Sequence, residues 1–293
     1  MRLAMTLLVR DEEDILEAHL RYHFAAGVDF VIATDNRSED GTKEILRAHE
    51  REGRLLLFEE DGDNYDQGRW VTRMARLAAT EHGADWVINS DADEFWWPDE
   101  GDLKAVFEAV PPTHLAVKAR IRNFVPRPPS TEPFFRSMTA RVREPTTKGA
   151  TTEPRREPAA KVCHRALRDI ELGRGNHAAF RRRLFWRRRL PAPRAPLTVL
   201  HFPVRSYAQF ANKIEKTGAA MARNGKLPAA SKAWPARVLY EAFLRGELKA
   251  HYERLVCDDD AIRAGIADGT LVLDQRLRDR LDVLGLGESG QPS

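Results

Sequence analysis

The feature that most constrains the fold is a regular alternation of short apolar runs and helical patterns across the first 125 residues. Apolar runs of strand length recur at 3–9, 29–34, 55–58, 86–89 and 115–121. Between them, apolar residues at helical spacing mark segments 12–26, 43–49, 67–82 and 102–110. Strands that alternate with helices predict a mostly parallel sheet with helices on both faces. We therefore expect an α/β fold.

The pattern changes after residue 125. Residues 126–158 are rich in Pro, Thr, Ser, Arg and Glu without clear periodicity, which predicts a long loop. Strand signals return at 161–164 and 197–201, and helical spacing covers most of the chain from residue 206 onward. We expect one domain over 1–215, with a first half at 1–125, a loop at 126–160 and a second half at 161–215. A helical region would follow at 216–293.

Composition limits the classes of protein that fit. The chain has 293 residues, of which 42% are hydrophobic and 31% are charged, so it can bury a sizeable core and stay soluble. No apolar stretch reaches membrane-spanning length, and no signal peptide is visible. The two cysteines, Cys163 and Cys257, are far apart, which argues against a disulfide framework. The expected location is the cytoplasm.

Asp91-Ala92-Asp93 is the strongest functional signal. It follows the β-branched run 86–89 and precedes the aromatic cluster 95–98. Two carboxylates at a strand end can face one hard divalent cation, which prefers oxygen ligands. Open α/β sheets bind ligands at the carboxyl ends of their strands. A solvated acidic turn is the alternative, but surface turns are seldom flanked by large apolar side chains.

The order of several motifs resembles a known family. Val9-Arg10-Asp11-Glu12, the segment 34–42, Asp91-Ala92-Asp93-Glu94-Phe95, Gly175-Asn176-His177 and the segment 201–206 follow one another along the chain. Together they resemble family-2-type glycosyltransferases with the GT-A fold, in particular a subgroup with Asp-Ala-Asp-Glu-Phe and a late Gly-Asn-His. The resemblance is strong over residues 3–125 and looser over 160–215. It implies a Rossmann-like GT-A domain with a helical C-terminal extension.

The resemblance implies a site for a nucleotide-diphospho-sugar donor. The residues that would bind it are Arg10, Glu12, Asp35, Arg73, Asp91 and Arg205. Two of them have equally simple structural readings. Glu12 would suit the first turn of a helix, and Asp35 would suit the turn that follows its strand.

The same resemblance implies a metal site and an acceptor site. Asp91, Asp93 and His201 would hold Mn²⁺ or Mg²⁺ against the diphosphate, and His177 would contact the acceptor, an unidentified glycan or a lipid-linked molecule. A lone histidine is more often a structural residue, so His201 is interpreted either as a metal ligand or as a structural residue.

The catalytic base is not identified by any motif. Inverting transfer, which the resemblance implies, needs a carboxylate that removes the proton of the acceptor hydroxyl. Glu94 beside the metal motif, and Asp169 and Glu171 in the second half, are the candidates.

Residues 181–189 carry six arginines around Leu184-Phe185-Trp186. The favoured reading is a solvated face with the apolar side chains turned inward. Peripheral contact with the inner face of a membrane ranks second, and nucleic acid is not expected as a partner.

Two other functions remain alternatives to a sugar transferase. A non-catalytic GT-A-like module that binds a nucleotide-sugar would have the same sheet. An Asp-x-Asp phosphohydrolase with Asp91 as nucleophile fits less well, because position 95 is Phe instead of Thr or Ser and about three strands precede the motif.

Overall fold

The structure is a computed structural model that describes residues 1–62, 67–143, 147–148, 156–157, 159–224 and 235–286. Tertiary contacts group the chain into two compact units. Unit 1 comprises residues 1–61, 66–121 and 159–200, and unit 2 comprises 62–65, 122–158 and 201–293. The division cuts through two continuous strands near their ends. The expected boundary at residue 215 stays a prediction.

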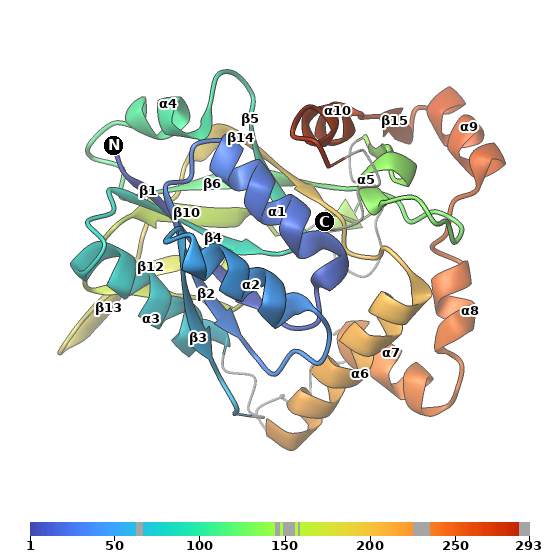
Figure 1. The fold of residues 1–293 in the computed structure, drawn as a ribbon, viewed down its shortest axis with the longest axis horizontal. Helices are drawn as coiled ribbons and strands as arrows, with labels where there is room; N and C mark the ends of the chain where they lie inside the picture. Colours follow the sequence, from blue (N-terminus) through green and yellow to red (C-terminus); the bar gives the residue numbers. More distant parts are fainter. Residues whose placement is uncertain (63–66, 144–146, 149–155, 158, 225–234, 287–293) are drawn as a thin grey trace. The chain divides into compact units, whose positions relative to one another are not determined.

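Unit 1 is built on an eight-stranded sheet (Figure 1). The strand order is β3 (Leu55–Glu59), β2 (Phe30–Asp35), β1 (Leu3–Val9), β4 (Trp86–Asp91), β10 (Lys161–Arg165), β6 (Ala116–Asn123), β14 (Arg194–His201) and β5 (Glu94–Pro98). The first four strands pair in parallel, whereas β10 is antiparallel to β4 and to β6. β1 is buried along nearly its whole length, so both faces of the sheet are covered. The predicted α/β class is confirmed.

Four helices of unit 1 connect these strands in the expected order. They are α1 (Glu13–Ala25), α2 (Thr42–Arg51), α3 (Gln67–Thr80) and α4 (Leu103–Glu108). Strand β5 was not expected, because its sequence is an aromatic cluster without alternation. It is held by tertiary contacts: Trp96 donates its backbone N–H to His23 Nε2 (3.1 Å), and Tyr22 donates its hydroxyl to the Trp96 carbonyl (2.9 Å).

A smaller three-stranded sheet lies against α3. It contains β11 (Ile170–Leu172), β12 (Ala179–Arg183) and β13 (Trp186–Arg189), with a short 3-10 helix η1 (Arg174–Asn176) between β11 and β12. The Leu172 N–H donates to Thr72 Oγ1 at 2.9 Å, and Arg76 Nε donates to the Ile170 carbonyl at 2.8 Å. The base of this sheet shares the core of unit 1, since Ile170 and Ala179 are buried there.

Unit 2 is mainly helical. Its elements are α5 (Phe134–Ser137), β7 (Ala140–Val142), β8 (Thr147–Lys148), β9 (Arg156–Glu157), α6 (Tyr207–Asn224), α7 (Pro235–Leu244), α8 (Leu248–Glu253), α9 (Asp259–Ala267), β15 (Leu271–Leu273) and α10 (Arg276–Val283). Within the described residues, no helix is both long and apolar enough to cross a membrane.

Two local expectations for this part of the chain need correction. The segment expected to be a loop contains α5 and β7, and parts of it lie outside the described residues. β7 pairs with β15, which lies more than 120 residues later, so no local sequence pattern predicts this strand. The helical region expected over 216–293 is interrupted between α7 and α8, because Gly246 adopts a left-handed conformation with φ of 73°.

Candidate functional site

Three neighbouring strands of unit 1 end at one edge of the sheet. In the parallel register Val9 lies opposite Asp35, and Leu8 lies opposite Asp91. Arg10, which directly follows β1, therefore reaches the same edge as Asp35 and Asp91. All three residues thus lie at one edge of the sheet. Their roles in binding stay predictions.

Asp35 is completely buried at this edge, and its two carboxylate oxygens have different surroundings. Oδ2 accepts the Ser38 N–H at 3.1 Å and lies 3.8 Å from Lys43 Nζ. Oδ1 is buried and has no hydrogen-bond partner among the described residues. A buried carboxylate oxygen without a donor is costly. The turn role expected for Asp35 is therefore met by one oxygen, and the other remains available to a ligand N–H.

The Asp-x-Asp motif forms the tight connection between β4 and β5. Ala92 and Asp93 make the turn, Asp91 ends β4 and Glu94 begins β5. A hydrogen bond within the connection stabilises it, because the Asp91 N–H donates to Glu94 Oε2 at 3.2 Å. Trp96 Nε1 also donates to Ser90 Oγ at 3.2 Å. Hydrogen bonds on both sides of the turn preorganise its carboxylates.

Lys161, the first residue of β10, joins the two carboxylates that flank this turn. Its Nζ lies 2.6 Å from Asp91 Oδ2 and 2.8 Å from Glu94 Oε1. Burial alone would lower the pKa of Lys161, but the charges of Asp91 and Glu94 outweigh it and hold that pKa above its ordinary value. The lysine is therefore a fixed positive charge inside the site.

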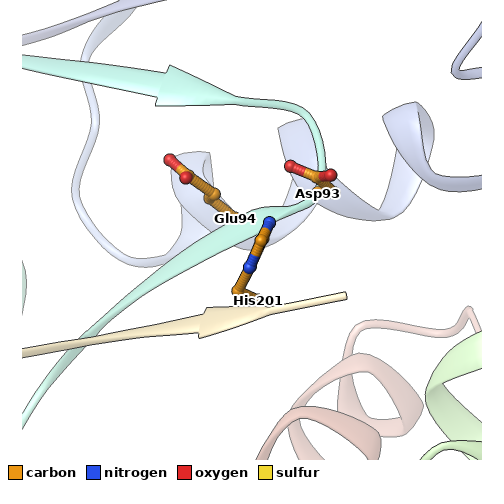
Figure 2. Close-up of side chains that lie close together, drawn as sticks. All are labelled: Asp93, Glu94 and His201. Atoms are coloured by element: carbon orange, nitrogen blue, oxygen red, sulfur yellow. The ribbon is translucent and has the colours of Figure 1, made fainter. Parts of the chain in front are cut away.

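Asp93, Glu94 and His201 form a buried group that could hold a metal ion. Each offers one ligand atom, and these atoms lie within 4.8 Å of one another. Figure 2 shows the imidazole of His201, at the end of β14, pointing toward the two carboxylates. Carboxylates suit Mg²⁺ and Mn²⁺, whereas an imidazole is less usual for Mg²⁺, so the donor set fits Mn²⁺ better.

Asn123 at the end of β6 orients His201. The His201 Nδ1 lies 2.8 Å from Asn123 Oδ1, and both side chains are buried. Because an amide oxygen only accepts, this hydrogen bond needs a proton on Nδ1, and Nε2 is then the nitrogen that would bind a metal ion. A hydrogen bond of this kind is what fixes the tautomer of metal-binding histidines.

The structure thus regroups the predicted metal ligands. It brings Asp93 and His201 together, adds Glu94, and places Asp91 against Lys161. Sequence reasoning missed Lys161 and Asn123, since a lone lysine after a loop and a lone asparagine at a strand end match no motif. Their only signal is that each polar residue sits at the end of an apolar strand.

The other candidates for the catalytic base lie in the smaller sheet. Asp169 is bound by Arg181 and Arg183, and Glu171 by Arg182 and Arg187. Burial raises the pKa of each carboxyl, but the arginines outweigh it and lower both pKa values overall. A carboxylate with a lowered pKa is a weaker base, so this geometry lends no support to either residue.

The remaining predicted residues have the following surroundings. Arg10 Nε is 3.9 Å from Asp11 Oδ2, and the backbone N–H of the buried Glu12 donates to Thr42 Oγ1 at 2.9 Å. Arg73 Nη1 is 2.6 Å from Glu60 Oε1, and its guanidinium lies over the Phe58 ring.

Two more lie later in the chain. Arg205 donates from Nη1 to the Phe202 carbonyl at 3.1 Å, and His177 Nδ1 is 3.2 Å from the Ala160 carbonyl oxygen. None of these contacts decides a role in binding.

Comparison with known proteins gives distant structural similarity only. No family model matches the chain, and no curated protein matches it. Glucosyl-3-phosphoglycerate synthase from Mycobacterium tuberculosis, in complex with Mn²⁺, UDP and phosphoglyceric acid, is similar at 20% identity with a TM-score of 0.31. That match covers 41% of this chain and 43% of the synthase, so the chain spans less than half the length of that protein.

A second structure is similar over more of the chain. The structure of S. aureus TarS 1–349 in complex with UDP has a TM-score of 0.37 and 14% identity, and the match covers 86% of this chain and 72% of TarS. The structure of TarS 1–349 alone gives a TM-score of 0.38, 12% identity and coverages of 87% and 83%. Similarity at this level does not establish a family.

Proposed function

We propose that this protein is a metal-dependent glycosyltransferase that moves a sugar from a nucleotide-diphospho-sugar to an acceptor hydroxyl. The observation that carries the proposal is the convergence of two features at the carboxyl ends of the β2, β1 and β4 strands. One is the buried Asp35 with an unused acceptor. The other is the Asp93–Glu94–His201 group beside the Asp-x-Asp turn. The order of motifs that resembles GT-A enzymes points the same way.

In this proposal Asp35 recognises the base of the nucleotide. Its Oδ1 is a buried acceptor, and a base N–H would satisfy it. Arg10 follows the neighbouring strand and would contact the same nucleotide, with Glu12, Arg73 and Arg205 as further candidates. Asp91 keeps 32% of its side chain exposed despite its bond to Lys161, so the donor can reach it.

Asp93, Glu94 and His201 are the residues that would hold Mn²⁺, or Mg²⁺ less favourably. When bound, the cation supplies positive charge beside the departing diphosphate. Lys161 adds a second, permanent positive charge next to the turn, which limits repulsion between Asp91 and Glu94 when no cation is present. The residues of the chain thus provide a preformed binding site.

The chemistry is a substitution at the anomeric carbon of the donor sugar. The acceptor oxygen forms a new bond to that carbon, the bond to the diphosphate oxygen breaks, and the nucleoside diphosphate leaves with the electron pair. The proton of the acceptor hydroxyl passes to a base, which we leave unassigned because Glu94 is ion-paired and grouped with the metal ligands. We propose inversion at the sugar and a glycan or lipid-linked acceptor near His177.

Two alternatives differ in what they require of the site. A phosphohydrolase would need Asp91 to act as a nucleophile, yet Asp91 is bound to Lys161, and Phe95 is fully buried and offers no hydroxyl. A non-catalytic module would bind the donor through the same residues without turnover. Only an activity measurement separates that module from a transferase.

The metal site can be tested without activity. Calorimetric titration of Mn²⁺ should show one site in the wild type. Asp93→Asn and His201→Ala should each weaken it strongly, and Asn123→Ala should weaken it by about 10–100-fold because the imidazole loses its orienting acceptor. Asp279→Asn, an exposed carboxylate on α10, is the matched control. Unchanged affinity in folded Asp93→Asn and His201→Ala would refute the metal assignment.

Catalysis is then tested by a screen of nucleotide-sugars for release of the nucleoside diphosphate, with and without Mn²⁺. A transferase should hydrolyse its own donor slowly, and only with metal. Binding of a nucleoside diphosphate without any turnover, with acceptors present, would favour the non-catalytic module. Release of phosphate from simple phosphomonoesters would favour the phosphohydrolase.

A further inference from the structure

The β12–β13 hairpin places two large apolar side chains in water. Leu184 and Phe185 form the two-residue turn of this hairpin, and each is 95% exposed. The expectation that the apolar residues of 181–189 face inward is therefore wrong for the tip. Asn, Asp and Gly are the residues that two-residue hairpin turns usually favour. Neither local turn chemistry nor packing within unit 1 accounts for Leu-Phe at this position.

The hairpin is rigidly anchored at the opposite end. Ala179 and Leu190, which flank its two strands, are buried in the core of unit 1 together with Ile170 and Leu172 of β11. Four consecutive residue pairs hold the two strands in register, from Phe180 opposite Arg189 to Arg183 opposite Trp186. Figure 1 shows the hairpin projecting at the left of the view. An ordered stalk thus presents an exposed apolar tip.

Arginines surround this tip on both strands. Arg181, Arg182, Arg183 and Arg187 pair with only two carboxylates, Asp169 and Glu171. Arg188 and Arg189 are exposed and make no ion pair within the described part of the chain. The hairpin therefore keeps an excess of positive charge next to its apolar turn.

We propose that the β12–β13 hairpin docks unit 1 onto an anionic lipid bilayer. Leu184 and Phe185 enter the interface between headgroups and acyl chains, and the arginines bind the lipid phosphates. Trp186, half-exposed beside the tip, suits the headgroup level, where amphipathic rings are favoured. The apolar tip matches the acyl chains of a lipid surface, and the arginines beside it match the lipid phosphates. A nucleic acid would use the arginines alone. The inference goes beyond the proposed sugar transfer and does not depend on it.

Sedimentation of the full chain with vesicles tests the proposal. Wild type should bind vesicles of phosphatidylcholine and phosphatidylglycerol, should bind phosphatidylcholine alone weakly, and should be released by high salt. Leu184→Ser with Phe185→Ser should weaken binding by about tenfold or more at unchanged charge. Arg188→Gln with Arg189→Gln should weaken it to a similar extent through charge alone.

Matched controls remove equivalent apolar or positively charged side chains at positions outside the hairpin. Leu244→Ser with Val283→Ser removes two exposed apolar side chains, and Arg47→Gln with Arg51→Gln removes two positive charges from α2. Both should bind as wild type does. Because Leu184 and Phe185 make almost no packing contacts, thermal unfolding should confirm that the tip variant is folded.

A fluorophore gives an independent measure of insertion. The two native cysteines are buried, so Leu184→Cys offers one exposed thiol for an environment-sensitive dye. Its emission should shift to shorter wavelength on anionic vesicles. Absence of vesicle binding by wild type, or equal binding by the tip variant, would overturn the proposal. Binding of an oligonucleotide that survives loss of Leu184 and Phe185, without vesicle binding, would assign the arginines to nucleic acid instead.

Discussion

Lys161 is the residue whose role depends most on burial. Its side chain is 5% exposed and that of Glu94 only 1%, so the pair lies where an unpaired charge is very unfavourable. Asp91 shares the same ammonium group, which makes the arrangement a three-membered network. In such a network the loss of one member costs more than the pairwise contacts suggest.

Lys161→Met should therefore lower the free energy of unfolding by about 3–5 kcal/mol, because two carboxylates are left without their cation. Lys161→Met with Glu94→Gln should recover part of this loss. Lys104→Met is the control, since Lys104 pairs with Asp29 at 2.7 Å on the partly exposed surface. That change should cost only about 0–1 kcal/mol. Urea unfolding measures all three, and equal costs at the two lysines would contradict the network.

At the scale of elements, the packing of α6 against α7 in unit 2 depends on one glycine. A Cβ built on Gly218 would lie 2.2 Å from Tyr240 Cγ, far closer than any real contact. Gly218 therefore permits the two helices to approach at this point. The cost of a glycine within a helix is offset by the close contact it allows.

Gly218→Ala should destabilise unit 2 by about 1–3 kcal/mol, because the tyrosine or the helices must move. Gly68→Ala on α3 is the matched control, since its Cβ would meet only an ordinary contact at 3.5 Å from the Leu172 carbonyl oxygen. That substitution should be neutral or stabilising by about 0.5–1 kcal/mol. Far-UV circular dichroism during thermal unfolding distinguishes them, and a stabilised Gly218→Ala would be inconsistent with the packing.

At the scale of the whole molecule, buried histidines predict sensitivity to mild acid. Burial lowers the pKa of His164 on β10 to about 4, and burial together with the neighbouring His19 lowers the pKa of His23 on α1 well below its ordinary value. In the unfolded chain each would titrate near 6.5. As pH falls from about 6.5 toward 4, the unfolded state takes up protons that the folded state does not, so stability decreases.

Tryptophan fluorescence during urea unfolding should show this decrease between about pH 6.5 and 4. His164→Gln should reduce the slope of the unfolding free energy against pH by up to about 1.4 kcal/mol per pH unit. Carboxylates whose pKa values are lowered by folding reduce the stability further, but only at lower pH. A wild type whose stability is flat over this range would show that these histidines are protonated when folded.

The sequence by itself determined the α/β class, because strand and helix periodicities are local and alternate clearly over residues 3–125. It also located Asp35, Asp91 and Asp93 at strand ends, since the polar residues follow directly on apolar runs. Parallel strands bring such ends to one edge, so part of the candidate site followed from chain order alone.

Only the tertiary structure decided which partners these residues meet. Lys161 and Asn123 reach the site through strands β10 and β6, which lie about 70 and 30 positions along the chain from Asp91. The order of strands in the sheet is set by long-range packing, and no local pattern encodes it. For the same reason the exposure of Leu184 and Phe185 could not be read from their apolarity. Apolar composition favours burial, and only the packed fold shows that no described residue of unit 1 covers them.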